Sequence, residues 1–331
     1  MKDPIKEEEF YNGDYKFSYS SLNKLLFSPK LFYKDYILKE RELKTDKHLI
    51  EGKLLHLVLL QPDKLHDEFS IVPNKIPSDN VRKVLKTLSN RFYDPNAFIK
   101  LKDLDNEIIK VLEENNLYQS FKDDLKKLSK IQTKENEEYY KFLCENQKKD
   151  IIDNDMLVKA TERVKQIKSN KNVMSLLEDK VTDFELDPLE SYNEKYLECE
   201  LNDYVFGLKG YIDRYIIDHE SKEITIIDFK TTSKGLEKFA ETVDFYNYWM
   251  QAVIYITLVI KSSKKDITNY KINFNFVVVD NYDQVYVFDV SDNTLQTWYE
   301  GFTKTLEEAR EEYIKRDYSL PYEFANNNVI L

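Results

Sequence analysis

The sequence predicts an α/β (α+β) fold in which a mixed central β-sheet is flanked by helices. Three observations support this prediction. Through the N-terminal half, apolar residues recur every three or four positions, which is typical of helices. From about Tyr196 the period changes to two over three successive runs, which indicates strands. A helical run, two more strand-like runs and a last helical run complete the order helices, sheet, helix, sheet, helix.

Length and composition are those of a globular protein. The chain has 331 residues, of which 42% are hydrophobic, so it can bury a substantial core. The longest apolar run, Met250 to Ile260, is too short for a membrane span and is interrupted by Gln251 and Tyr255. The first residues, MKDPIKEEEF, lack the apolar core of a secretory signal. We therefore expect a cytoplasmic protein without a membrane segment.

The net charge and the numbers of cysteines and glycines argue against several classes of function. A net charge of −11 argues against nonspecific coating of nucleic acid, which needs clustered Lys and Arg, but leaves room for an enzyme with a locally basic groove. Cys144 and Cys199 are the only cysteines and form no C-x-x-C pair, so neither a disulfide framework nor a Cys-rich zinc site is predicted. Six glycines and no Walker or dinucleotide pattern argue against a nucleotide-binding loop.

The expected helices before the sheet fall into two sets. Residues 17–36 are interrupted at Ser28 and Pro29, so two short helices fit them best, and residues 49–60 form a helix with His56 in its middle. Residues 78–180 are rich in Lys, Glu, Leu and Asn, and we expect them to form a helical insertion. The whole chain, 1–331, would then be one domain whose catalytic sheet and flanking helices occupy 190–316.

The sheet is predicted from alternating runs in the second half of the chain. Three of them, YLECEL, YVFGLKGYIDRYII and EITIIDFK, are expected to form an antiparallel meander, with the turn DHESK between the last two. A helix over about 245–261 follows. The strands INFNFVVVD and QVYVFDV, joined by NYD, and an acidic helix over about 293–316 complete the pattern.

Asp213, Asp228 and Lys230 form the candidate catalytic cluster. Strand alternation places Asp228 and Lys230 on one face, and a modest hairpin register brings Asp213 beside Asp228. Two neighbouring carboxylates repel each other unless a cation lies between them, and Mg²⁺ or Mn²⁺ prefers oxygen ligands. Alone, D-x-K is more often a solvated pair, but this strand is apolar, where unpaired charges are costly. The cluster predicts metal-assisted hydrolysis of a phosphodiester.

With these motifs in order, the sequence resembles the PD-(D/E)XK nuclease superfamily, and within it the RecB-like nucleases and RecE-type phage exonucleases (exodeoxyribonuclease VIII-like). GYIDRY and IIDFKTT resemble its second and third motif strands, GKLLH its first-motif helix, and SYSSLNKLLFSPKLFYKDYIL its opening segment. Gln251 and Tyr255 match the Q-x-x-x-Y motif. The resemblance implies a restriction-endonuclease-like core and extends over most of the chain.

The resemblance also implies residue roles. The metal ligands, for Mg²⁺ or Mn²⁺, would be His56, Asp213, Asp228 and the backbone carbonyl of Phe229. Lys230 would partner the attacking water, while Gln251 and Tyr255 would support DNA binding and the lysine. Without the resemblance, His56 alone is more simply explained as a buried structural histidine.

Four further charged residues are weaker candidates for the site. Glu198 is a candidate for an acidic residue that the family often carries before the second motif, and Glu200 on the same strand face competes with it. Lys209 and Arg214 share a strand with Asp213 and can meet phosphates, but exposed charge is the more frequent meaning of such residues, so both stay outside the predicted site.

The implied function is exonuclease digestion of linear double-stranded DNA, which makes single strands for recombination. The alternatives are an endonuclease or structure-specific nuclease of the same fold, and an inactive DNA-binding relative. The resemblance further implies DNA with an end as substrate, a single-strand annealing protein as partner, a homo-oligomeric ring, and a bacterial host cytoplasm if the gene belongs to a phage. Ser28 stands where the iron–sulfur branch of the family carries Cys, so no iron–sulfur cluster is expected.

Overall fold

In the computed structural model of the protein, the described residues are 10–11, 15–40, 47–73, 75–94, 96–177 and 189–319. The start of the chain, on which the expectation about a secretory signal depends, falls outside them except for Phe10, as do 178–180 at the end of the expected insertion. The fold has two compact units, one of Met1–Gln61 with Thr161–Leu331 and one of Pro62–Ala160. Each unit is described by itself below.

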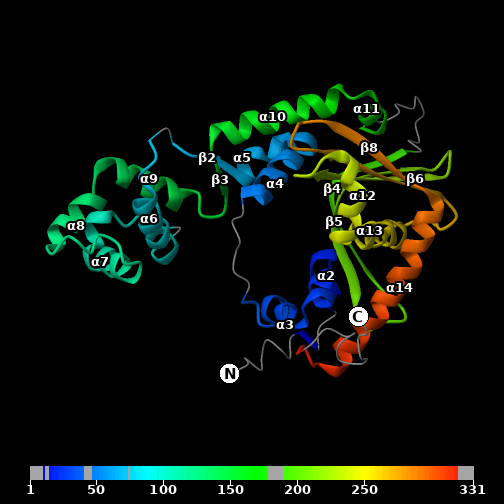
Figure 1. Cartoon of the computed structure of the whole chain (residues 1–331), viewed down its shortest axis with the longest axis horizontal. Coiled ribbons are helices and arrows are strands. Elements are labelled where there is room, and N and C mark those ends of the chain that lie inside the picture. Colours follow the sequence, from blue (N-terminus) through cyan, green and yellow to red (C-terminus); the bar gives the residue numbers. More distant parts are fainter. Residues whose placement is uncertain are drawn as a thin grey trace. The chain divides into compact units, whose positions relative to one another are not determined.

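A mixed sheet forms the centre of the larger unit (Figure 1). Its order is β1-β5-β6-β7-β8, with β4 on the other edge of β5. Strand β5 is antiparallel to both β4 and β6, β6 and β7 are parallel, and β8 is antiparallel to β7. This arrangement confirms the predicted fold class. The strands are β1 (Lys16–Phe17), β4 (Leu189–Glu200), β5 (Gly207–Asp218), β6 (Glu223–Thr231), β7 (Lys271–Val279) and β8 (Val285–Val290).

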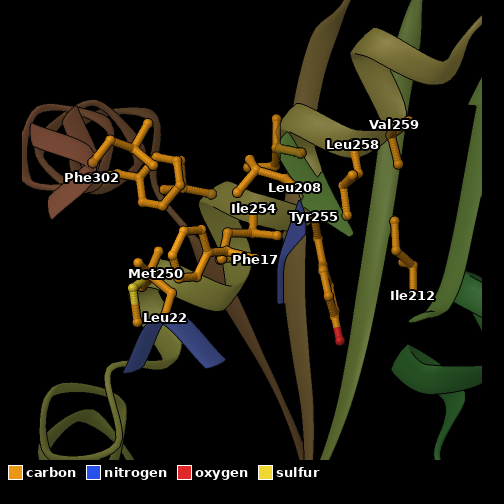
Figure 2. Packing of buried hydrophobic residues seen from close by; sticks show 14 of the residues in the cluster. Phe17, Leu22, Leu208, Ile212, Met250, Ile254, Tyr255, Leu258, Val259 and Phe302 are labelled. Atoms are coloured by element: carbon orange, nitrogen blue, oxygen red, sulfur yellow. The ribbon is translucent and has the colours of Figure 1, made fainter. Parts of the chain in front are cut away.

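Helices cover both faces of this sheet (Figure 1). Phe17, Ile254 and Phe302 belong to the core on one face, which Figure 2 shows from close by. Ile167 and Phe229 belong to the core on the other face. The first face is covered by α2 (Tyr19–Phe27), α12 (Phe239–Phe245), α13 (Tyr248–Ser262) and α14 (Asp292–Lys315), and the second by α4 (Lys47–Leu60), α10 (Asn154–Ser169) and α11 (Lys171–Leu177).

Local sequence explains where the opening helices start. Ser18 caps α2 and forms a capping box with Ser21, and Ser28 caps α3 (Pro29–Phe32), whose first position is the proline. A π-helical turn, Tyr33–Ile37, follows. The predicted break at Ser28 and Pro29 is therefore confirmed.

The helix α13 is the crossover that makes β6 and β7 parallel. Nine of its fifteen residues are buried, because it lies between the sheet and α14. A helix that is apolar on nearly all sides is typical of such a central position. Burying one large apolar side chain contributes about 1.5–3 kcal/mol, so this helix anchors the face of the sheet on which Asp228 lies.

The smaller unit is mainly helical and has its own apolar core, which includes Leu88, Ile108 and Tyr140. It spans 62–160, whereas the expected insertion is 78–180. Within the latter range, α10 and α11 contribute Ile167 and Val173 to the core on the sheet of the larger unit. Its elements are a 3₁₀ turn (Pro62–Lys64), α5 (Leu65–Glu68), β2 (Phe69–Ile71), α6 (Asp79–Arg91), a second 3₁₀ turn (Leu101–Asp103), α7 (Asp105–Glu114), α8 (Asp124–Ile131), α9 (Lys134–Glu145) and β3 (Asp150–Ile152), with β2 and β3 parallel.

Among the residues that the structure describes, no helix combines the length and apolar character that crossing a bilayer requires.

Candidate active site

The candidate site lies where β5 and β6 separate. These strands pair only as far as Arg214 and Ile227, and beyond this point β6 runs alongside β7 alone among the described strands. The backbone of Phe229 is thereby released from β5. Its N–H donates to Oδ2 of Asp213 at 2.7 Å, and its carbonyl oxygen lies 3.1 Å from Nε2 of His56. The divergence of two strands thus brings a carboxylate, a carbonyl and an imidazole together.

Glu194 of β4 belongs to the same cluster, although it is not among the residues predicted from the sequence. It lies opposite Asp213 between two paired positions, with φ of 47°. Such a left-handed backbone is strained for Glu, costs about 1–3 kcal/mol and is found preferentially at functional sites. The Nδ1 atom of His56 is 3.4 Å from Oε1 of Glu194 and 3.5 Å from Oδ1 of Asp213.

The three side chains form a candidate metal-binding group. One ligand atom from each of His56, Glu194 and Asp213 lies within 4.8 Å of the others. Oε1 of Glu194 has no hydrogen-bond partner within the described part of the chain, although it is buried. Since a buried carboxylate oxygen without a partner is costly, a cation bound here would stabilise the group. Carboxylates with one imidazole suit Mn²⁺ and Mg²⁺, with the nitrogen favouring Mn²⁺.

Asp228 and Lys230 form a buried ion pair beside this group. Both lie on the α13 face of β6, and Nζ of Lys230 is 2.5 Å from Oδ2 of Asp228, which is fully buried. Among the described residues, neither oxygen of Asp228 accepts a hydrogen bond of good geometry. Burial and the nearby charge of Asp213 raise the pKa of Asp228 to about 6, against the opposing effect of Lys230. The metal-binding group of His56, Glu194 and Asp213 does not include Asp228, whose role as a ligand stays a prediction.

The charges of the cluster depend strongly on one another. Burial opposes the charged form of His56, but Asp213 and Glu194 outweigh it and raise its pKa to about 10. Burial likewise works against ionised Asp213, yet His56, Lys230 and the Phe229 N–H together lower its pKa. For Lys230, the two aspartates outweigh burial and raise the pKa. Protonated His56 thus carries the positive charge that a bound cation would supply.

Gln251 and Tyr255 lie beside the carboxylates on α13. The Gln251 amide donates from Nε2 to the Tyr255 hydroxyl at 2.7 Å, and both side chains are buried. The Tyr255 ring lies against Gly210 of β5, where an added Cβ would come within 3.3 Å of Cε1 of the ring. Figure 2 shows the Tyr255 hydroxyl pointing away from the apolar side chains. Burial, followed by the charges of Asp213 and Asp228, raises the pKa of Tyr255, so the hydroxyl keeps its proton.

Comparison with known proteins shows to which family the chain belongs. A profile of the PD-(D/E)XK nuclease superfamily matches residues 16–319. The chain belongs to this superfamily. No curated protein matches the chain. A crystal structure from Eubacterium rectale, provisionally described as an exonuclease, is 11% identical and covers 100% of this chain and 94% of that chain, with a TM-score of 0.48.

Glu198, the further candidate from the sequence, lies apart from the metal-binding group. Glu198 accepts a hydrogen bond from the Tyr196 hydroxyl and pairs with Lys16. Its backbone lies opposite Lys209, which precedes Asp213 on β5. Its side chain is exposed. The structure therefore does not bring Glu198 into the cluster.

Two basic residues of β5 have structural contacts. Lys209 lies 5.8 Å from the centre of the Tyr15 ring. Arg214, expected to be exposed, is buried and donates to Oδ1 of Asn193 at 2.7 Å and to the carbonyl of Leu177 at 2.9 Å. Tyr15, Asn193 and Leu177, which these contacts involve, do not belong to the cluster.

Proposed function

We propose that the chain is a divalent-metal-dependent DNA exonuclease that hydrolyses phosphodiester bonds from the ends of linear duplex, in the manner of RecE-type relatives. The observation that carries this proposal is the His56–Glu194–Asp213 group beside the buried pair of Asp228 and Lys230. End dependence is supported by the resemblance of the opening segment, 17–36, and of the Q-x-x-x-Y helix to RecE-type enzymes.

His56, Glu194, Asp213, Asp228 and the carbonyl of Phe229 would hold Mg²⁺ or Mn²⁺. Their fit to a cation rests on the hydrogen-bond partners that Glu194 and Asp228 lack among the described residues. When bound, the ion supplies charge that polarises the scissile phosphate and lowers the pKa of a water molecule. The N–H of Phe229 holds one oxygen of Asp213, which leaves the other oriented toward His56.

Lys230 acts on the reacting phosphate. Its ammonium group is held between Asp228 and the ring of Tyr248, whose centre lies 4.7 Å away, and its raised pKa keeps it charged. As water attacks phosphorus and the bond to the leaving oxygen breaks, negative charge grows on the phosphoryl oxygens. A fixed cation stabilises that charge without reorganisation. Gln251 and Tyr255 border the carboxylates and keep the α13 side of the site ordered.

One assay tests the proposal. Purified protein is incubated with end-labelled linear duplex and with closed circular duplex, in Mg²⁺, in Mn²⁺ and in chelator, with Asp213→Asn as the inactive control. We expect linear DNA to be digested only with metal, and circular DNA to persist. Equal loss of both substrates would identify an endonuclease instead, and binding without cleavage would identify an inactive relative.

A further inference from the structure

A row of aromatic side chains leads outward from Lys230 along the segment that joins α12 to α13. The ring of Tyr248 faces the ammonium group, and the ring of Tyr246 stacks on Tyr248 at 5.5 Å between centres and 23° between planes. Phe245 meets Tyr246 edge-on at 4.9 Å. Exposure rises along the row: Tyr248 is partly buried, Tyr246 is 46% exposed and Phe245 is 72% exposed. Large rings presented to water beside a polar site indicate a binding surface.

The row is fixed in place by the turn that carries it. Asn247 has φ of 56°, a left-handed conformation that Asn adopts more readily than most other residues. Its side chain donates to Asn23 at 2.8 Å and accepts from Trp249 at 3.1 Å. The carbonyl of Tyr246 accepts hydrogen bonds from the Tyr19 hydroxyl and from the Asn23 amide. A surface held this firmly loses little entropy when a ligand binds.

A cation lies at each end of the row. Lys230 is at the inner end, and the exposed Lys234, which follows β6, has Nζ 5.6 Å from the centre of the Phe245 ring at the outer end. Aromatic faces next to cations are the combination that binds single-stranded nucleic acid, since bases stack on the rings and phosphates meet the charges. A duplex keeps its bases stacked on one another, so this surface suits an unpaired strand.

We propose that Phe245 and Tyr246 form a stacking site for an unpaired base of the strand that is cut, close to the scissile phosphate, with Lys234 contacting a phosphate of the same strand. This inference rests on the proposed function, because it assumes that the phosphate at Lys230 belongs to DNA. It adds a substrate requirement: one or more terminal nucleotides leave the duplex before cleavage. Phe245 and Tyr246 are then binding residues.

The first test measures binding without cleavage. A single-stranded oligonucleotide with 2-aminopurine near one end is titrated in chelator, and its fluorescence reports stacking. Phe245→Ala and Tyr246→Ala should each weaken binding at least about fivefold and reduce quenching. Tyr282→Ala, which removes a ring that is 79% exposed outside the row, should leave both unchanged. Lys234→Ala should lower the salt dependence of log Kd by about 0.7, whereas Phe245→Ala should not.

A second test identifies the occupant. If a base stacks on Phe245, an abasic nucleotide at that position and Phe245→Ala should each weaken binding, but together they should weaken it no further. Additive losses, or binding by Phe245→Ala and Tyr246→Ala as tight as wild type in a protein that cuts DNA, would overturn the stacking site and leave the proposed function standing. A wild-type protein that neither binds nor cuts DNA would refute both.

Discussion

Two histidine–carboxylate groups, one at each of two glutamates of β4, have opposite characters. In the first, Nε2 of His219 is 2.8 Å from Oε1 of Glu190 and Nδ1 is 3.0 Å from the Tyr270 hydroxyl. Both ring nitrogens are therefore hydrogen-bonded. Lys265, 3.7 Å from Glu190, places a cation beside this carboxylate.

The second group holds more negative charge than the protein neutralises. His56 lies 3.4 Å from Glu194 and 3.5 Å from Asp213, beyond a close hydrogen bond. Among the described residues, buried oxygens of Glu194 and Asp228 accept no hydrogen bond of good geometry, although Asp228 is ion-paired with Lys230. The difference teaches how to separate a structural histidine from a ligand. Completed hydrogen bonds indicate a structural histidine, whereas several buried acceptors around one imidazole indicate a group that a cation would stabilise.

The largest expected effect is on the cleavage rate, when the lysine beside each histidine–carboxylate group is replaced in turn by alanine. Lys230→Ala should slow single-turnover cleavage of linear duplex by about 10²–10³, because it removes a fixed charge at the developing phosphoryl charge. Metal affinity should survive, since the ligands remain. Lys265→Ala, the matched change beside His219, should leave the rate unchanged. Near-normal cleavage by folded Lys230→Ala would make Lys230 a structural partner of Asp228.

The two glutamates of β4 nearest the site provide a second contrast. Glu194→Gln should weaken Mn²⁺ binding at least about tenfold, because a carboxylate ligand becomes a neutral amide. Glu198→Gln should have no effect on Mn²⁺ affinity, since its side chain is exposed and pairs with Lys16. Calorimetric titration of the two variants with Mn²⁺ compares them directly. A larger loss in Glu198→Gln would restore it as the ligand and remove Glu194.

Metal affinity should also depend on pH through His56. Its pKa of about 10 means that imidazole is protonated at neutral pH, so a metal must displace a proton to bind. Affinity for Mn²⁺ should rise between pH 6.5 and 8.5 by up to about tenfold per unit. The His56→Ala variant should bind Mn²⁺ weakly, and its Mn²⁺ affinity should depend much less on pH. Titrations in buffers of different ionisation enthalpy report the released proton directly, and an affinity independent of pH would exclude His56 as a ligand.

The smallest effect concerns the satisfied histidine. His219→Ala removes one hydrogen bond from Glu190 and one from Tyr270, so the free energy of unfolding should fall by about 1–3 kcal/mol. Neither cleavage nor Mn²⁺ affinity should change. Urea unfolding with a parallel Mn²⁺ titration measures both quantities, and a loss of metal affinity here would remove the distinction between the two groups.

Most of the fold was predictable because its elements have strong periodicity. The mixed sheet, the break at Pro29 and the crossover helix all follow from apolar spacing and helix-breaking residues. The early start of β4 was not predictable in this way. Its first residues, LESYNEK, are polar and aromatic, and burial alternation changes phase near Glu194, where φ is positive.

The same irregularity limited the prediction of the site. Asp213, Asp228 and Lys230 were recognised as a motif, and the structure gathers them with His56 at the point where β5 and β6 diverge. Glu194 was missed because a strand of strict period two gives no hint of a residue turned inward by a left-handed backbone. Extending β4 back to Leu189 and seeking an acid opposite Asp213 would have found it.

The central claim is that the His56–Glu194–Asp213 group binds a divalent cation, and thermal unfolding with Mn²⁺ tests it most directly. At a Mn²⁺ concentration about one hundred times Kd, binding should stabilise the wild-type protein by about 2.7 kcal/mol and raise Tm, whereas Asp213→Asn should show almost no rise. His219→Ala should unfold earlier but keep the full rise. An equal rise in Asp213→Asn and wild type would contradict the account.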